Sequence, residues 1–155
     1  MKFNILTFVV FLVINFGALA IGGLFTSSGV DSDWYAALNK APWTPPGWFF
    51  GVAWTTIMIC FSFYMMRLWD TADNKQQVLW VFALQVLLNI GWNPVFFYFK
   101  EEVMGLLIIS ALTLVISFFL FNYLKPLGVW SLFIVPYFLW IITATSLNAY
   151  IVWAN

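Results

Sequence analysis

The chain has 155 residues, of which 64% are hydrophobic, 22% are aromatic and only 8% are charged. A soluble domain is usually about one quarter charged, so six acidic and six basic side chains cannot supply the polar shell of a water-soluble fold. The net charge of zero gives no reason to expect a nucleic-acid partner, and the absence of histidine from the sequence removes the commonest metal ligand and general base.

The charged side chains are gathered in short clusters that leave five long uncharged stretches, at residues 3–30, 41–66, 76–99, 103–124 and 126–155. A helix crosses the hydrocarbon core with about 20 residues, and a charge at its centre costs roughly 2.5–3.5 kcal/mol. Membrane strands would instead alternate apolar and polar residues over segments of about 10. The sequence therefore predicts an all-α integral membrane bundle, one domain over residues 1–155, with five transmembrane helices and a structured first loop.

The first predicted helix covers residues 3–25. The sequence Ala18-Leu19-Ala20 resembles a signal-peptide cleavage site, but the apolar run continues too far for a signal peptide. Ala18 and Gly22 form a small-xxx-small pair, which is typical of helices that pack closely, either within one chain or between two chains.

The longest predicted connection, residues 26–46, contains a short helical turn at 34–38. Three prolines stiffen its second half, Pro42, Pro45 and Pro46. Thr44 is a candidate cap for the helix that follows. The many aromatic side chains of this loop favour either a lid over the helix bundle or a belt at the membrane interface, and composition leaves both open.

Four more helices are predicted at 46–68, 76–99, 103–123 and 129–152, with Pro94 late in the second of them and Pro136 interrupting the last. Five crossings put more basic residues on the side of the N-terminus, namely Lys2, Arg67, Lys75 and Lys125, than on the other side, which has Lys40 and Lys100. The positive-inside rule then places the N-terminus in the cytoplasm.

Three predicted helices each carry an indole beside small or polar residues on one face. These faces are Gly47, Gly51, Trp54, Met58 and Phe61; Gln85, Asn89, Trp92 and Asn93; and Tyr137, Trp140, Ala144 and Asn148. Amides are costly in hydrocarbon unless paired, so we expect them to face inward. The three faces can enclose an apolar pocket with tryptophan walls, or the same aromatics can fill a solid core. From Val103 to Phe121, the helix 103–123 offers only hydroxyls as polar groups, and it is predicted to be a lipid-facing or structural wall.

The sequence contains no hydrolase constellation. Without histidine there is no Ser/His/Asp or Cys/His pair, and there is no glycine-rich phosphate loop. The predicted spans contain no acidic residue, which argues against a conventional ion-coupled transporter.

Three motifs, in order along nearly the whole chain, carry a resemblance to a known family. They are Trp34-Tyr35…Leu38-Asn39-Lys40…Trp43-Thr44-Pro45-Pro46…Trp54, then Gln85…Asn89…Trp92-Asn93-Pro94-Val95-Phe96-Phe97, then Pro136-Tyr137…Trp140…Ala144-Thr145…Leu147-Asn148. In them the sequence resembles the translocator protein family, also called tryptophan-rich sensory proteins and peripheral-type benzodiazepine receptors. The resemblance implies a five-helix bundle, usually a homodimer, whose pocket binds protoporphyrin-type tetrapyrroles and drug-like molecules with no required cofactor.

Carried over position by position, the resemblance implies ten ligand-binding residues: Tyr35, Trp43, Phe50, Trp54, Asn89, Trp92, Asn93, Trp140, Ala144 and Leu147. It implies a sensor or regulator of tetrapyrroles, and it leaves open a carrier for porphyrin or lipid and a light- and oxygen-dependent porphyrin breakdown. In the last case Trp54 and Trp140 would be catalytic, because an excited porphyrin can exchange an electron with an adjacent indole. A scaffold without a small ligand is a further alternative.

The sequence departs from the family pattern in two places. Proline follows the lysine directly in many relatives, whereas here the loop reads Lys40-Ala41-Pro42-Trp43, so a local backbone difference is expected. Residues 150–155 contain no basic residue to complete the animal cholesterol motif, so a sterol partner is not expected. Cys60 should point away from the Trp54 face, which favours a metal-free porphyrin over ligated haem, and no metal site is predicted. Without mitochondrial-type targeting, the expected location is a bacterial inner membrane.

Overall fold

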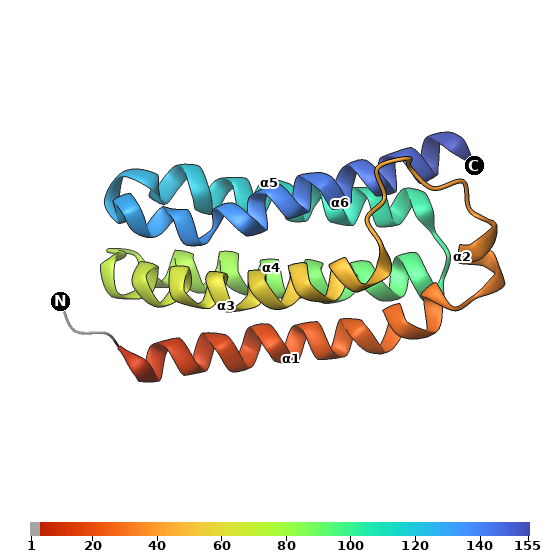
Figure 1. Cartoon of the computed structure of the whole chain (residues 1–155). Helices are drawn as coiled ribbons and strands as arrows, with labels where there is room; N and C mark the ends of the chain where they lie inside the picture. Colours follow the sequence, from red (N-terminus) through yellow and green to blue (C-terminus); the bar gives the residue numbers. More distant parts are fainter. Residues whose placement is uncertain (1–3) are drawn as a thin grey trace.

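The computed structural model describes residues 4–155, and within that range every regular element is helical. The elements are α1 (Ile5–Val30), α2 (Asp33–Ala37), α3 (Gly47–Thr71), α4 (Lys75–Asn93), α5 (Glu102–Leu127) and α6 (Val135–Ala154). The five long helices lie side by side along a common direction, and α2 lies with its flanking loops at one end of the bundle (Figure 1). The predicted all-α class is confirmed.

Four stretches are long and apolar enough to cross a membrane: Ile5–Val30, Gly47–Thr71, Lys75–Tyr98 and Glu102–Ala154. The last is a 53-residue hairpin, because the chain turns back at a 3₁₀ helix, Gly128–Phe133, and α6 returns beside α5 (Figure 1). These lengths and compositions are those of an integral membrane protein.

The first helix ends later than predicted. Residue 3, the predicted start, lies outside the described residues, and α1 continues past residue 25 to Val30. The hydroxyl side chains of this extension lie against the backbone of their own helix: Thr26 Oγ1 is 3.2 Å from the Gly22 carbonyl oxygen, and Ser28 Oγ donates to the Phe25 carbonyl at 3.1 Å. Because these hydroxyls bond to their own helix, a polar stretch that resembles a loop continues the helix.

The predicted cap of α3 is wrong. Thr44 Oγ1 donates to the carbonyl oxygen of Ala41 at 2.7 Å, and the residue that precedes the helix is Pro46, with no side-chain cap. The other end of α3 reaches Thr71 rather than residue 68. The threonine therefore closes a turn in the loop instead of starting the helix.

Two prolines mark changes of helix type. Pro94 ends α4 and begins a π-helix, Pro94–Tyr98, so the predicted helix 76–99 changes its hydrogen-bond pattern there. Pro136 does not interrupt the last helix, which begins at Val135 rather than at residue 129. A proline in the first turn loses no helical hydrogen bond, because those N–H groups have no partner within the helix.

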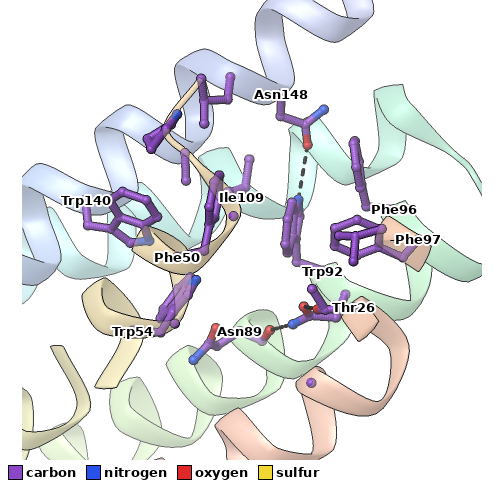
Figure 2. A pocket seen from close by; sticks show the side chains of 18 of the residues that line it. Thr26, Phe50, Trp54, Asn89, Trp92, Phe96, Phe97, Ile109, Trp140 and Asn148 are labelled. Carbon is purple, nitrogen blue, oxygen red and sulfur yellow. Dashed lines mark hydrogen bonds between the residues drawn. The ribbon is translucent and has the colours of Figure 1, made fainter. Parts of the chain in front are cut away.

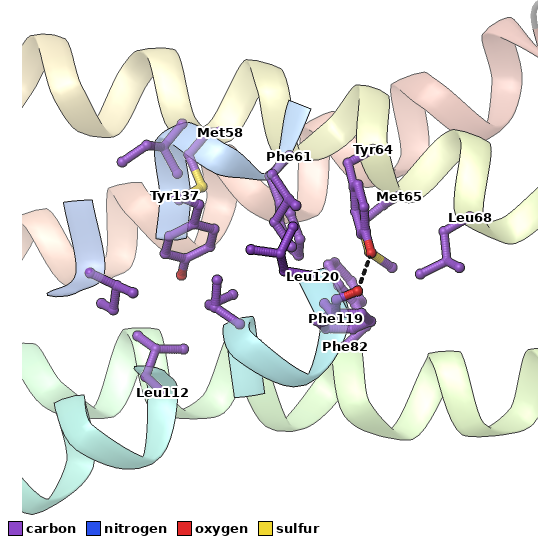
Figure 3. Packing of buried hydrophobic residues seen from close by; sticks show 14 of the residues in the cluster. Met58, Phe61, Tyr64, Met65, Leu68, Phe82, Leu112, Phe119, Leu120 and Tyr137 are labelled. Carbon is purple, nitrogen blue, oxygen red and sulfur yellow. Dashed lines mark hydrogen bonds between the residues drawn. The ribbon is translucent and has the colours of Figure 1, made fainter. Parts of the chain in front are cut away.

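The half of the bundle farther from α2 has a solid aromatic core. Phe61, Tyr64, Phe119 and Tyr137 are fully buried there (Figure 3). The Tyr64 hydroxyl donates to the Phe119 carbonyl at 2.6 Å, and Gln85 Nε2 donates to the Tyr137 hydroxyl at 2.8 Å. Gln85 is only 1% exposed, which confirms that this amide faces inward. The solid-core alternative therefore describes this half of the molecule.

The small pair in the first helix is used inside the chain. Ala18 and Gly22 are buried, and a Cβ atom at Gly22 would lie 2.6 Å from Asn93 Nδ2. The glycine thus lets α1 approach α4, which is the intramolecular alternative. A contact between two copies of the chain would need a different surface.

Candidate ligand-binding site

A cavity of about 710 Å³ lies in the half of the bundle nearest α2. Its walls come from the later part of α1, the start of α3, the end of α4, the π-helix Pro94–Tyr98 and the later part of α6. Pockets for small molecules usually have volumes of about 300–1,000 Å³ and mostly apolar walls with few polar groups. The size and position of the cavity therefore suit a small organic guest (Figure 2).

Three indoles line the cavity, and each is held against another aromatic ring. Trp92 is stacked on Phe96 with ring centroids 5.3 Å apart, and Trp140 meets the edge of Phe50 at 5.3 Å. Trp54 contacts the buried ring of Tyr137 at 5.9 Å. These contacts fix the orientation of the indoles, so their flat faces form preset walls for a planar guest (Figure 2).

The space between these walls depends on small residues. A Cβ atom added at Gly23, Gly47 or Gly51 would meet no atom within 4 Å, and all three glycines line the cavity. Ala144 lines it from α6. Larger side chains at these positions would extend into the cavity.

Most amides at the cavity are committed to the protein. Thr26 Oγ1 donates to Asn93 Oδ1 at 2.5 Å, and Asn93 Nδ2 donates to the Asn89 carbonyl at 2.9 Å. Asn148 Oδ1 accepts from Trp92 Nε1 at 3.1 Å, while its Nδ2 donates to the Glu102 carbonyl at 3.1 Å. These bonds join α1, α4, α5 and α6 around the cavity.

Asn89 is different. Asn89 lines the cavity and is only 7% exposed. Its side-chain amide nevertheless has no hydrogen-bond partner in the part of the chain that the structure describes, and only its backbone carbonyl accepts a bond. An amide both donates and accepts, so Asn89 can pair with a polar edge of a guest.

Comparison with known proteins agrees with this architecture. A model of the TspO/MBR family matches residues 8–154, which include nearly all of the helical bundle. The chain belongs to the TspO/MBR family. A tryptophan-rich sensory protein of Cereibacter sphaeroides is 33% identical over 117 residues, 75% of this chain and 73% of that protein.

Similar relatives come from distant organisms. A tryptophan-rich protein TspO of Archaeoglobus fulgidus is 32% identical over 131 residues, 82% of each chain. The human translocator protein is 28% identical over 129 residues, 79% of this chain and 74% of that protein. The resemblance inferred from the three motifs is thus confirmed, and the membrane bundle is that of a TspO/MBR protein.

Nine of the ten predicted site residues line the cavity of this TspO/MBR protein: Tyr35, Phe50, Trp54, Asn89, Trp92, Asn93, Trp140, Ala144 and Leu147. Trp43 is not among the lining residues. It is 53% exposed, its Nε1 donates to Ser146 Oγ at 3.1 Å, and its ring packs against Tyr150. Trp43 therefore fastens the loop to α6 and does not face the cavity.

The first loop borders the cavity, which is the position that the lid alternative expects. Tyr35, Lys40, Thr44 and Pro45 line the cavity as a lid does. The Tyr35 phenol is neutral at pH 7, as an ordinary tyrosine is, and burial raises its pKa further. Trp48, which follows the loop in the first turn of α3, is 69% exposed, as a residue of an interfacial belt would be.

Sequence reasoning missed one wall of the cavity. Leu19, Gly23, Thr26 and Val30 of α1 line it, and no indole or amide marks that part of the sequence. Thr26 was the available signal, because a hydroxyl at the end of an apolar run can bond to a neighbouring amide. Ile109 of α5 also lines the cavity, which makes α5 a structural wall.

Proposed function

We propose that this TspO/MBR protein is a membrane receptor or sensor that binds protoporphyrin-type tetrapyrroles in the cavity and takes part in tetrapyrrole regulation. The observation that carries the proposal is the set of three indoles, Trp54, Trp92 and Trp140, around about 710 Å³ of space. A planar apolar guest gains both burial and stacking in such a site. The name of the Cereibacter relative, a sensory protein, supports the sensor role.

The polar groups favour one orientation of the guest. The free amide of Asn89 lies on the α4 side of the cavity, whereas Lys40 borders it from the loop. A porphyrin has ring nitrogens at its centre and carboxylates on one edge, and it can use both kinds of contact. Drug-like molecules with a flat apolar body fit the same walls.

The test is a titration with metal-free protoporphyrin, read by tryptophan fluorescence in detergent micelles. We expect saturable quenching, because a guest in the cavity lies beside three indoles. Quenching that rises in proportion to porphyrin without reaching a plateau, as it does for porphyrin that merely enters the micelle, would contradict binding in the cavity.

A second candidate is light- and oxygen-dependent breakdown of the bound porphyrin. It is favoured by one observation, that Trp54 and Trp140 line the same cavity. A light-excited porphyrin there would lie beside two indoles, with which it could exchange an electron. Under illumination in air, the porphyrin absorption should decay several-fold more slowly with Trp54→Phe and Trp140→Phe together. Trp80→Phe is the matched control, since Trp80 is 68% exposed and does not line the cavity. Equal decay in all three proteins would exclude a catalytic role for these indoles.

We further propose five crossings of a bacterial inner membrane, with the N-terminus in the cytoplasm and two copies forming a homodimer. Arg67, Lys75 and Lys125 lie in or beside the turns at one end of the bundle, whereas Lys40 and Lys100 lie at the cavity end. Lys2, which adds to the first group, lies outside the described residues. The positive-inside rule then puts the cavity end outside.

The orientation is tested with Asp31→Cys in a Cys60→Ser background. We expect the new thiol to react with an impermeant maleimide in intact cells. A thiol that does not react would place the cavity end in the cytoplasm.

A further inference from the structure

Arg67 is a partly buried cation near the end of α3, at the end of the bundle farther from α2 (Figure 1). Its guanidinium has no ion pair and no hydrogen bond within residues 4–155, and its Nε is enclosed without a partner. Asp70 follows one turn later, but its carboxylate accepts from Asn4 Nδ2 at 3.5 Å and does not pair with the arginine. A partly buried charge is costly without a counterion, so a partner from outside the chain is expected here.

Aromatic side chains restrain the arginine. Its Cζ lies 6.0 Å from the ring centroid of Trp130, which belongs to the 3₁₀ helix Gly128–Phe133. The Trp130 ring stacks on Phe133 with centroids 5.5 Å apart, and Phe133 packs against Phe63 of α3 at 5.3 Å. A cation within about 6 Å of an indole ring is attracted to its face. The rings therefore restrain the guanidinium at the rim of the bundle, where its terminal nitrogens, unlike Nε, are not enclosed.

The surface beside this arginine is suited to lipid. Val129 and Leu132, on the same 3₁₀ helix as Trp130, are 75% and 66% exposed. Apolar side chains that are so exposed in the turn between two membrane helices gain free energy when lipid covers them, and tryptophan favours the headgroup region. Arg67 stands four residues before Thr71, the last residue of α3, which is about 6 Å along the helix axis. Its long side chain can therefore reach the level of the lipid phosphates.

We infer that Arg67 and Trp130 form a binding site for the phosphate of an anionic phospholipid, in the leaflet at this end of the bundle. Two oxygens of one phosphate can bridge the terminal nitrogens of the guanidinium, and the acyl chains then lie against Val129 and Leu132. A zwitterionic lipid brings its own cation to the same place, so a lipid with a net negative charge is preferred. Neither Arg67 nor Trp130 lines the cavity, so this site does not depend on porphyrin binding.

The chain contains a matched control for this arginine. Lys125 lies in the last turn of α5, at the same end of the bundle, and is exposed. The cations that lie over an aromatic ring of the described residues are Lys40, Arg67, Lys75 and Lys100, and Lys125 is not among them. Its replacement changes the net charge by the same amount and leaves the proposed site intact.

The experiment titrates the purified protein with phosphatidylglycerol or with phosphatidylcholine of the same acyl chains, and counts the bound lipids by native mass spectrometry. We expect the wild type to bind phosphatidylglycerol about tenfold more tightly, the effect of a single charge-assisted bond, and Arg67→Met to lose this preference. Arg67→Lys should show an intermediate preference, because an ammonium offers no fork for two phosphate oxygens. Lys125→Met should behave as the wild type.

Two further measurements separate the ways in which this can fail. The apparent melting temperature of Arg67→Met in detergent without added lipid shows whether the variant is folded; if it is not, Arg67→Lys decides, and a full wild-type preference in that variant contradicts the bridged phosphate. Inorganic phosphate should not displace the lipid, and displacement at equal concentration would show a site for free phosphate instead.

Two results would overturn the inference directly. One is equal binding of the two lipids by the wild type, and the other is an undiminished preference in folded Arg67→Met. Either result leaves the proposed function intact, because the porphyrin titration reports on the cavity and the lipid titration on the opposite end of the bundle.

Discussion

Replacing Ala144 by phenylalanine should weaken porphyrin binding at least tenfold while leaving the bundle folded. Ala144 lines the cavity from α6, one helical turn from Trp140. A benzyl group there occupies space that the guest needs, and a tenfold loss of affinity corresponds to only about 1.4 kcal/mol of lost binding free energy. The measurement is the saturation curve of tryptophan quenching, with the apparent melting temperature recorded in the same detergent.

Ala20→Phe is the matched control for this substitution. Ala20 is exposed on α1 and does not line the cavity, so the same change of side chain leaves the space for the guest intact. We expect its titration to follow the wild type. Wild-type affinity in Ala144→Phe would place the porphyrin somewhere other than this cavity.

The fold could be predicted from the sequence because the bilayer restricts where charges lie. Clusters such as Arg67 to Lys75 and Lys100 to Glu102 occur at the ends of helices, and the apolar runs between them define the bundle. Helix ends were less predictable, since hydroxyl residues after position 25 bond to their own helix and prolines such as Pro136 stand in a first turn.

The helical faces predicted which residues point inward but not whether they enclose space. Trp54, Met58 and Phe61 share one face of α3, yet Trp54 lines the cavity and the other two are fully buried in the core. Periodicity gives the direction of a side chain around its own helix. Whether that direction meets a void depends on the residues of other helices at the same depth, which a single sequence does not specify.

The place of Trp43 could not be derived from its motif either. It belongs to the stiff aromatic loop, as the cavity-lining residues Lys40 and Thr44 do, but its ring lies against Tyr150 on α6. Neighbouring residues of an irregular loop point in different directions, and no periodic pattern assigns them.

A second large effect is expected where α1 meets the π-helix Pro94–Tyr98. A Cβ atom at Gly29 would overlap Cβ, Cγ and Cδ1 of Phe97. Phe97 is buried, and its ring packs against Phe96 at 5.0 Å and Trp92 at 5.6 Å. Since the overlap includes Cβ, turning the ring cannot relieve it, and one of the two helices must shift.

Gly29→Ala should therefore destabilise the protein by about 1–3 kcal/mol and lower its apparent melting temperature in detergent by about 5 °C. Gly17→Ala is the control in the same helix, because a Cβ atom there meets nothing within 4 Å. Alanine favours a helix by roughly 0.5–1 kcal/mol over glycine, so this variant should melt at the wild-type temperature or above it. A lower melting temperature for Gly29→Ala, beside an unchanged or higher one for Gly17→Ala, would show that tight packing of α1, and not helix propensity, sets stability at the cavity end. Equal melting temperatures for the two variants would mean that α1 does not pack on Phe97 as described.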